Sequence, residues 1–205
     1  MSALSPLHQA PVFDRSQTDL VLPSEVVDRF YARAKAIHAS GLKSYGLFVA
    51  DPRSPAYPFT ACDVVFFDPT KNRRNDPRLR SAFEAQGSYF KSYDDAGFVA
   101  DSHELLLVHQ QLEEGGLEAV AMFHSHRRQP ANFSQIDYRL HNPAYPWHLI
   151  VAMREPHRPV LRAFEVRKDS GNFGIDPSDD NQNSELEYTG PEVRPLRIVV
   201  EPRAA

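Results

Sequence analysis

The sequence predicts a single α/β domain in which a mixed β-sheet is flanked by helices. Short apolar runs typical of strands alternate with longer amphipathic segments typical of helices. The chain has 205 residues, of which 41% are hydrophobic, and this is enough to bury one sizeable core. No internal repeat divides the sequence, so we expect one domain over residues 20–166, after a flexible N-terminal segment at 1–19.

The first elements follow from local patterns. A short strand at 20–22 precedes Pro23, and a helix then runs to Gly41. Apolar residues fall on one face of this helix, so it should pack on the core: Val26, Val27, Phe30, Ala34 and Ile37. Strands are expected at 45–50 and 62–67, joined by a proline-rich connection, with Cys62 buried in the second strand.

The least regular part of the sequence is an insertion at 68–100, in which basic residues precede aromatic ones. This composition could indicate RNA binding, but no stacking module accompanies it. We therefore expect a surface loop with a short helix and a few buried anchors. Long insertions beside active sites often recognise substrates, so a partner could dock here.

The second half of the chain continues the α/β pattern. A helix is expected at 102–114, and strands at 117–123, 148–153 and 161–166. Residues 167–205 form a polar C-terminal extension. Its apolar residues alternate over 194–201, which predicts an edge strand or a strand that binds a partner.

Composition excludes several classes of function. The net charge is −4 with mixed signs, so neither nucleic-acid binding nor a basic membrane face is indicated. The longest apolar runs are far shorter than the ~20 residues of a membrane span. Cys62 is the only cysteine, which excludes an internal disulfide and, with no secretory signal, leads us to expect a cytoplasmic protein.

The most informative motif is His124-Ser125-His126, followed after seven residues by Ser134-Gln135-Ile136-Asp137. Two histidines at the end of a strand point to the same side, because side chains alternate between faces. Ser134 and Asp137 share one face of a helix. Two imidazoles and a carboxylate leave a fourth ligand position open, which is typical of catalytic zinc sites.

Each half of this motif has a simpler interpretation. Ser134 and Asp137 alone would be an acidic capping box at the start of a helix. The histidine pair alone is also a weak signal, because nine histidines are scattered along the chain. A strand that ends in His-x-His, a short loop and a helix that opens with Ser-x-x-Asp are together far more specific.

His124-Ser125-His126, the spacer and Ser134-x-x-Asp137 resemble the signature of the JAMM/MPN+ zinc metalloproteases. The segments 101–105 and 147–151 resemble the bacterial branch that trims ubiquitin-like sulfur carriers, and the likeness covers about residues 20–166. The resemblance implies a cytidine-deaminase-like mixed sheet. It also implies zinc as the cofactor and hydrolysis of an amide bond after the Gly-Gly of a β-grasp carrier protein.

The same resemblance implies roles for individual residues. His124, His126 and Asp137 would be the zinc ligands, and Ser134 would donate a hydrogen bond to the developing oxyanion. The family places a glutamate three residues before the glycine of its first core strand, as the general base. Here that position is Lys43, which cannot act as this base while it is protonated. General acid–base help is worth about 10²–10⁴-fold, so its loss should nearly silence a peptidase.

Other residues near the motif are weaker candidates. Arg127 and Arg128 follow the second histidine, and they belong either to a solvated loop or to a site that docks an acidic tail or carboxylate. Asp63 and Glu104 could replace the missing glutamate, although each is more typical of a strand edge or of the first turn of a helix.

Two functions therefore remain open. The first is an active zinc peptidase that acts on a ubiquitin-like sulfur carrier. The second is a catalytically impaired pseudo-enzyme that binds a ubiquitin-like or metabolic partner. Neither the carrier nor the oligomeric state follows from the sequence, and a homodimer stays among the alternatives.

Overall fold

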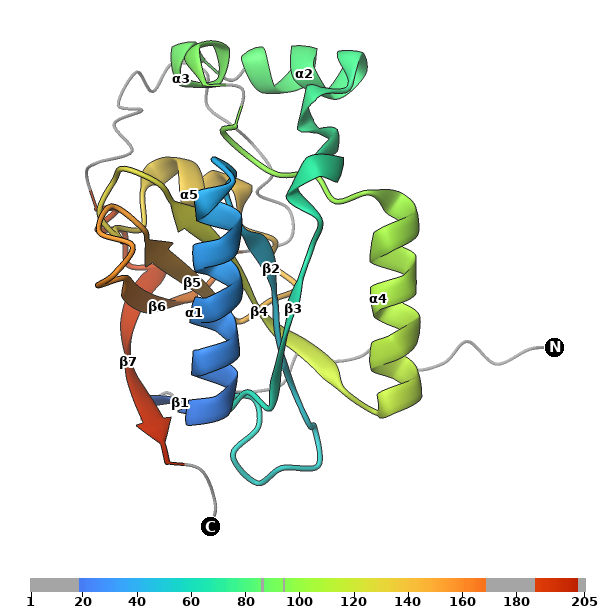
Figure 1. The fold of residues 1–205 in the computed structure, drawn as a ribbon, viewed down its shortest axis with the longest axis vertical. Helices are drawn as coiled ribbons and strands as arrows, with labels where there is room; N and C mark the ends of the chain where they lie inside the picture. Colours follow the sequence, from blue (N-terminus) through green and yellow to red (C-terminus); the bar gives the residue numbers. More distant parts are fainter. Residues whose placement is uncertain (1–18, 86, 94, 169–186, 203–205) are drawn as a thin grey trace, which may run out of the picture.

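The computed structural model describes residues 19–85, 87–93, 95–168 and 187–202, and the expected flexible segment at 1–19 therefore lies almost entirely outside them. These residues form a seven-stranded sheet with helices packed around it (Figure 1). The strands follow the order β1-β7-β6-β5-β4-β2-β3 across the sheet. Their bounds are β1 Asp19–Pro23, β2 Tyr45–Ala50, β3 Asp63–Phe66, β4 Glu118–His126, β5 Trp147–Ala152, β6 Val160–Val166 and β7 Val193–Glu201.

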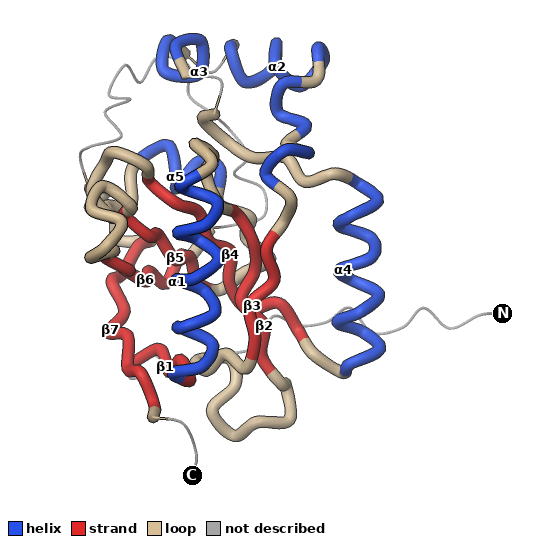
Figure 2. Tube along the Cα trace, viewed as in Figure 1, coloured by secondary structure: helices blue, strands red, loops and turns tan. Residues whose placement is uncertain are grey.

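The sheet is mixed, as the sequence predicts. β4 and β5 are parallel, as are β1 and β7, whereas the other neighbouring pairs are antiparallel. Short 3-10 turns and five helices connect the strands (Figure 2). They are η1 Pro69–Lys71, η2 Arg73–Asn75, α1 Ser24–Ala39, α2 Pro77–Glu84, α3 Ser88–Ser92, α4 Ser102–Gly115 and α5 Gln135–Leu140.

The alternation of side chains in β2 divides the core between two helices. Phe48 faces the cluster that contains Phe30 of α1, and these two rings lie 5.3 Å apart. Leu47 and Val49 face the opposite side, where they pack with Val108 of α4. Because successive strand residues point to opposite faces, α1 and α4 cover opposite faces of β2.

Gly46 in β2 is required by close packing rather than by backbone conformation. A Cβ atom at this position would lie 2.6 Å from the Phe123 ring and would also clash with the carbonyl oxygen of Val65. Both neighbours belong to strands that pair with β2, so neither can withdraw easily. The absence of a side chain at Gly46 therefore allows β2 to pair closely with β3 on one side and with β4 on the other.

The insertion at 68–100 is more regular than the sequence suggests, because it contains η1, η2, α2 and α3. Arg74 organises it from a fully buried position. Its guanidinium donates to the backbone carbonyl oxygens of Ala96 at 2.7 Å, Phe90 at 2.5 Å and Tyr93 at 3.0 Å. Arg74, which the sequence suggests is a surface cation, thus forms the buried centre of this segment.

Two local predictions are wrong. Residues 194–201 do form a strand, but β7 lies between β6 and β1 in the order of the sheet, since residues 193–196 pair with β6 and 197–201 with β1. Binding of a partner by this strand stays a prediction. Cys62 is exposed rather than buried, because β3 begins only at the next residue. In the described part of the chain, no helix has the length and apolarity that a membrane crossing requires.

Candidate metal centre

The site forms where the end of β4 meets the start of α5. The alternation of strand side chains sends His124 and His126 to one side of β4. Ser125 points to the other side, where its hydroxyl accepts a hydrogen bond from the backbone N–H of Ser44 at 2.8 Å. The chain then turns and enters α5, whose first turn places Asp137 opposite the two imidazoles.

The three predicted ligands converge in the structure. Nε2 of His124 lies 2.9 Å from Nε2 of His126 and 3.0 Å from Oδ1 of Asp137. Nε2 of His126 lies 3.9 Å from Oδ2 of Asp137. All three candidate ligand atoms lie within 4.8 Å of one another, a separation that one metal ion can bridge.

The hydrogen-bonding chemistry of these atoms fits a cation. Nδ1 of His126 lies 2.6 Å from the carbonyl oxygen of Pro130, which can only accept, so this nitrogen carries the proton. In the neutral ring, Nε2 then presents a lone pair to the site. A lone pair beside a carboxylate and a second imidazole nitrogen is an arrangement that a metal ion satisfies, and two histidines with one aspartate suit zinc.

Ser134 and Asp137 form the capping box and belong to the candidate metal site at the same time. The Ser134 hydroxyl and backbone N–H both donate to Oδ2 of Asp137, at 2.6 and 2.7 Å. The N–H of Asp137 in turn donates to the Ser134 hydroxyl at 3.2 Å. The two interpretations of this motif are therefore compatible, because the cap holds the carboxylate that faces the histidines.

The surroundings keep the candidate ligands in metal-binding protonation states. Burial acts to raise the pKa of Asp137, but His124 and His126, when either ring is protonated, and the hydrogen bond from the Ser134 hydroxyl outweigh it and hold this pKa well below its usual range. Burial and the neighbouring His124 lower the pKa of His126 to about 4. At neutral pH the site therefore contains a carboxylate and a neutral His126.

Lys43 lines the same pocket. In the register of β2 with β4, Tyr45 pairs with His124, so two residues earlier the chain reaches the level of His126. The Lys43 ammonium donates to the backbone carbonyl of Asp95 at 3.1 Å and lies 3.4 Å from its Oδ1. Burial lowers the pKa of Lys43, and Asp95 opposes this effect.

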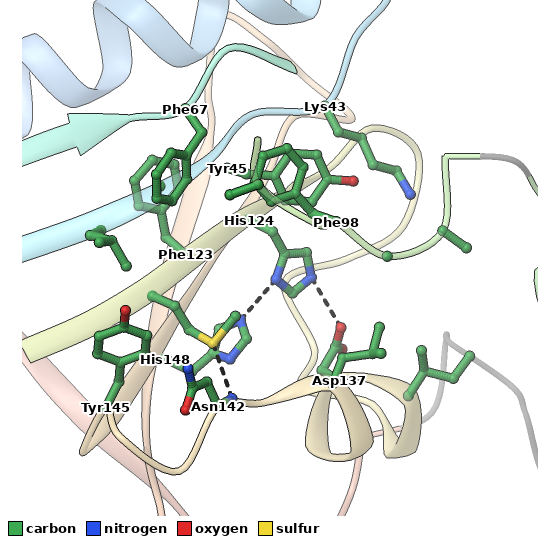
Figure 3. A pocket seen from close by; sticks show the side chains of 18 of the residues that line it. Lys43, Tyr45, Phe67, Phe98, Phe123, His124, Asp137, Asn142, Tyr145 and His148 are labelled. Atoms are coloured by element: carbon green, nitrogen blue, oxygen red, sulfur yellow. Dashed lines mark hydrogen bonds and ion pairs between the residues drawn. The ribbon is translucent and has the colours of Figure 1, made fainter. Parts of the chain in front are cut away.

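The pocket has a polar part at the histidines and an apolar part beside it (Figure 3). The cavity has a volume of about 320 Å³ and lies between β2, β4 and α4. Its polar part includes Lys43, Gln129 and Ser134 in addition to the three candidate ligands. Its apolar part is lined mainly by Tyr45, Leu47, Phe67, Phe98, Ala100, Leu105, Met122 and Tyr145.

Four other candidates lie outside the lining of this pocket. Arg127 is half-buried near Gly41, and Arg128 is exposed, so their predicted contact with substrate stays a prediction. Asp63 pairs with Arg29 at 2.9 Å. Glu104 accepts a hydrogen bond from the backbone N–H of Asp68 at 2.8 Å. Neither carboxylate lines the pocket, so neither lies where the resemblance leads us to expect a general base.

Sequence reasoning missed two buried histidines behind the site. His148 of β5 contacts His124, and His141 contacts His148. His148 lies at the start of the strand that follows α5, and such a strand can pair with β4. This position could have indicated that His148 lies near the two histidines of β4. His141 follows α5 in a loop, and no sequence pattern marks it.

Comparison with known proteins assigns the family. Residues 52–166, more than half of the chain, match the family of prokaryotic homologs of the JAB domain. The chain belongs to this family. The matched segment contains the His-His-Asp group and ends with β6, but it begins after Lys43 and β2. Membership is thus consistent with a metal site, whereas the matched segment does not include the Lys43 position.

Two solved structures with TM-scores above 0.5 agree on the fold of this JAB-domain protein, and a third shows a weaker likeness. Protein DSY2949 from Desulfitobacterium hafniense is 19% identical, with a TM-score of 0.56 over 90% of this chain and 94% of that chain. A protein from Salinibacter ruber is 17% identical, with a TM-score of 0.51 over 89% and 92%. AF2198, a JAB1/MPN domain protein from Archaeoglobus fulgidus, is 11% identical, with a TM-score of 0.42 over 89% and 99%. None of the curated proteins matches the sequence.

Proposed function

We propose that this JAB-domain protein is a zinc-dependent peptidase that hydrolyses the amide bond after the Gly-Gly of a ubiquitin-like β-grasp sulfur carrier. The observation that carries the proposal is the convergence of His124, His126 and Asp137 within 4.8 Å, at one end of a pocket. Three protein ligands leave one position for water or substrate, which distinguishes catalytic from structural zinc sites.

The residues of the site divide the work among themselves. The zinc ion, when bound, supplies Lewis acidity for attack on an amide carbonyl. His126 is held by the Pro130 carbonyl, and Asp137 by the Ser134 cap, so both ligand atoms are preorganised. The Ser134 hydroxyl donates its one proton to Asp137 in this structure, so the oxyanion-stabilising role that the family resemblance implies, and that we assign to it, requires the hydroxyl to turn toward the substrate. A Gly-Gly tail, which has no side chains, could approach the polar end of the pocket in extended form.

Lys43 limits the rate that we expect. It is an ammonium group that pairs with Asp95, and while it stays protonated it cannot remove a proton from water. The rate enhancement that a carboxylate base provides elsewhere in the family, about 10²–10⁴-fold, is therefore missing here. We propose that native hydrolysis is slow and depends on the metal and on Ser134.

The Lys43–Asp95 pair also favours a second function. If hydrolysis is lost altogether, the same pocket still binds a carrier tail or a small metabolic partner as a pseudo-enzyme. Both the peptidase and the pseudo-enzyme require the carrier tail to enter the pocket, so the two functions differ only in whether the tail is cleaved.

A cleavage assay tests the proposal. A β-grasp carrier with a short extension after its Gly-Gly is incubated with the zinc-loaded protein, and the products are measured by intact mass. Asp137→Asn is the matched control, since it keeps the size of the side chain but removes the charge. A product that ends at the second glycine, formed by the native protein and not by the control, supports the peptidase. Carrier binding without any product supports the pseudo-enzyme, and neither binding nor product contradicts both functions.

A further inference from the structure

A chain of three histidine rings runs from the candidate metal site into the core. Nδ1 of His124 lies 2.8 Å from Nε2 of His148, and Nδ1 of His148 lies 3.1 Å from Nδ1 of His141. Nε2 of His141 lies 3.0 Å from the carbonyl oxygen of Tyr145. Figure 3 shows the His124 ring between Asp137 on one side and His148 on the other. The roles proposed above make no use of His148 or His141.

The carbonyl at the end of this chain determines where every proton lies. A carbonyl oxygen can only accept, so Nε2 of His141 donates to Tyr145. A neutral His141 then has its lone pair on Nδ1 and accepts from Nδ1 of His148. By the same rule, His148 accepts at Nε2 from Nδ1 of His124. The lone pair of His124 is therefore left on Nε2, the atom that faces Asp137 and His126.

Burial supports the neutral state that this reasoning requires. His141 and His148 are each only 1% exposed. Burial lowers the pKa of His141 to about 4, so this ring carries one proton at neutral pH. His148 has a ring nitrogen of His141 on one side and one of His124 on the other, and a ring with one proton donates at one nitrogen while it accepts at the other.

Lys168 and Phe133 hold the two inner rings, His141 and His148, in place. The Lys168 ammonium donates to the carbonyl oxygens of Arg139 at 2.6 Å and of His141 at 3.3 Å, which holds the end of α5 in place. The Phe133 ring packs edge-on against His148, with ring centroids 5.2 Å apart. The rings thus have little freedom to rotate away from their hydrogen bonds.

We propose that His148 and His141 are positioning residues. They connect His124 to the Tyr145 carbonyl through a series of hydrogen bonds, which keeps the proton of His124 on Nδ1 and its Nε2 lone pair toward the metal. His126 reaches the same state in one step, through the carbonyl of Pro130. Partners behind metal-binding histidines orient the ring and select its tautomer. The proposal rests on the zinc site of the proposed function, but not on its substrate or on turnover.

Zinc affinity tests the relay without any measurement of activity. His148→Phe keeps an aromatic ring beside Phe133 but removes the acceptor for His124, and we expect zinc binding about 10–100-fold weaker in competition with a chromophoric chelator. His148→Gln offers an amide oxygen near the place of Nε2 and should recover most of the affinity. Tyr145→Phe keeps the backbone carbonyl, so it is the matched control and should bind zinc as the native protein does.

A spectroscopic measurement addresses the direction of the hydrogen bonds. Long-range ¹H–¹⁵N spectra of the native imidazoles should show protons on Nδ1 of His124, Nδ1 of His148 and Nε2 of His141. In His141→Phe, which does not touch His124, we expect mixed tautomers of His148 and a smaller loss of zinc affinity. A proton on Nε2 of His148 in the native protein would overturn the proposal, even if His148→Phe failed to fold. Unchanged zinc affinity in a folded His148→Phe would also overturn it, whereas a lack of carrier cleavage would leave it intact.

Discussion

The ammonium group of Lys43 lies 3.4 Å from Oδ1 of Asp95, although the two residues are far apart in the sequence. The hydroxyl of Tyr45 also donates to the Asp95 carbonyl, at 3.1 Å. β2 is thereby tied to the segment 68–100 at the rim of the pocket. The side chain that the resemblance places at the position of the family's glutamate is therefore held by a residue of the insertion.

Replacement of Lys43 by glutamate tests the consequence for catalysis. A carboxylate at this position restores a general base, and we expect the rate of carrier cleavage to rise about 10²–10⁴-fold. Because the new carboxylate would lie beside Asp95, their repulsion raises the pKa of one of them. The double variant Lys43→Glu/Asp95→Asn removes this repulsion and should be at least as active.

Lys43→Gln is the control for this experiment, since it removes the charge without adding a base, and its rate should not rise. A fall in activity from native protein to Lys43→Glu would contradict the account. Lys43 would then have a catalytic role of its own, and the family mechanism would not apply to this chain.

Arg74 should be essential for the segment that carries Asp95. Lysine cannot bind three carbonyl oxygens with a planar fork, so Arg74→Lys leaves at least one buried acceptor unpaired, at a cost of about 1–3 kcal/mol. We expect lower stability in urea and faster proteolysis within residues 85–97. The exposed Arg78 provides the control, because Arg78→Lys should change neither. Equal urea midpoints for Arg74→Lys and native protein would refute this role.

Ser134→Ala should affect stability and metal binding together. The substitution removes the side chain that caps α5, which typically costs about 0.5–2 kcal/mol. It also removes one of the donors to Oδ2 of Asp137, so the pKa of this carboxyl should rise toward its usual value. Urea unfolding with a chelator present and zinc competition without it measure the two effects. Native behaviour in both experiments would show that the cap does not hold the ligand.

The zinc-free protein should lose stability in mild acid because of His141. Burial lowers the pKa of His141 from 6.5 to about 4, so below pH 6.5 the unfolded chain binds a proton that the folded chain does not. The free energy of unfolding therefore decreases as the pH is lowered from about 6.5 to about 4, by up to about 1.4 kcal/mol per pH unit for this group. Urea midpoints from pH 7.5 to 4.5 should fall less steeply for His141→Phe, and parallel pH profiles would rule out this contribution.

The sequence predicted the site better than its surroundings, for physical reasons. Strand alternation and helical spacing are local rules, and they bring His124, His126, Ser134 and Asp137 together once β4 and α5 are recognised. The α/β fold and the mixed sheet follow from equally local patterns. Lys43 lies in the pocket because one pairing register, between β2 and β4, determines its position.

Long-range pairings could not be predicted in the same way. The partner of Lys43 is Asp95, in a segment without periodicity, and Arg74 is buried only because carbonyl oxygens of distant residues surround it. β7 lost its expected edge position because β1, from the other end of the chain, pairs with it. The histidines at 141 and 148 meet only after β5 has been placed beside β4.

Zinc content tests the central claim most directly. Native protein and His126→Ala are loaded with zinc, freed of excess metal by desalting and analysed for metal and protein together. The account predicts about one zinc per native chain and a large loss in His126→Ala, because three protein ligands become two. Native protein that binds no zinc after loading, or a variant that retains all of it, would contradict the assignment of His124, His126 and Asp137 as a metal centre.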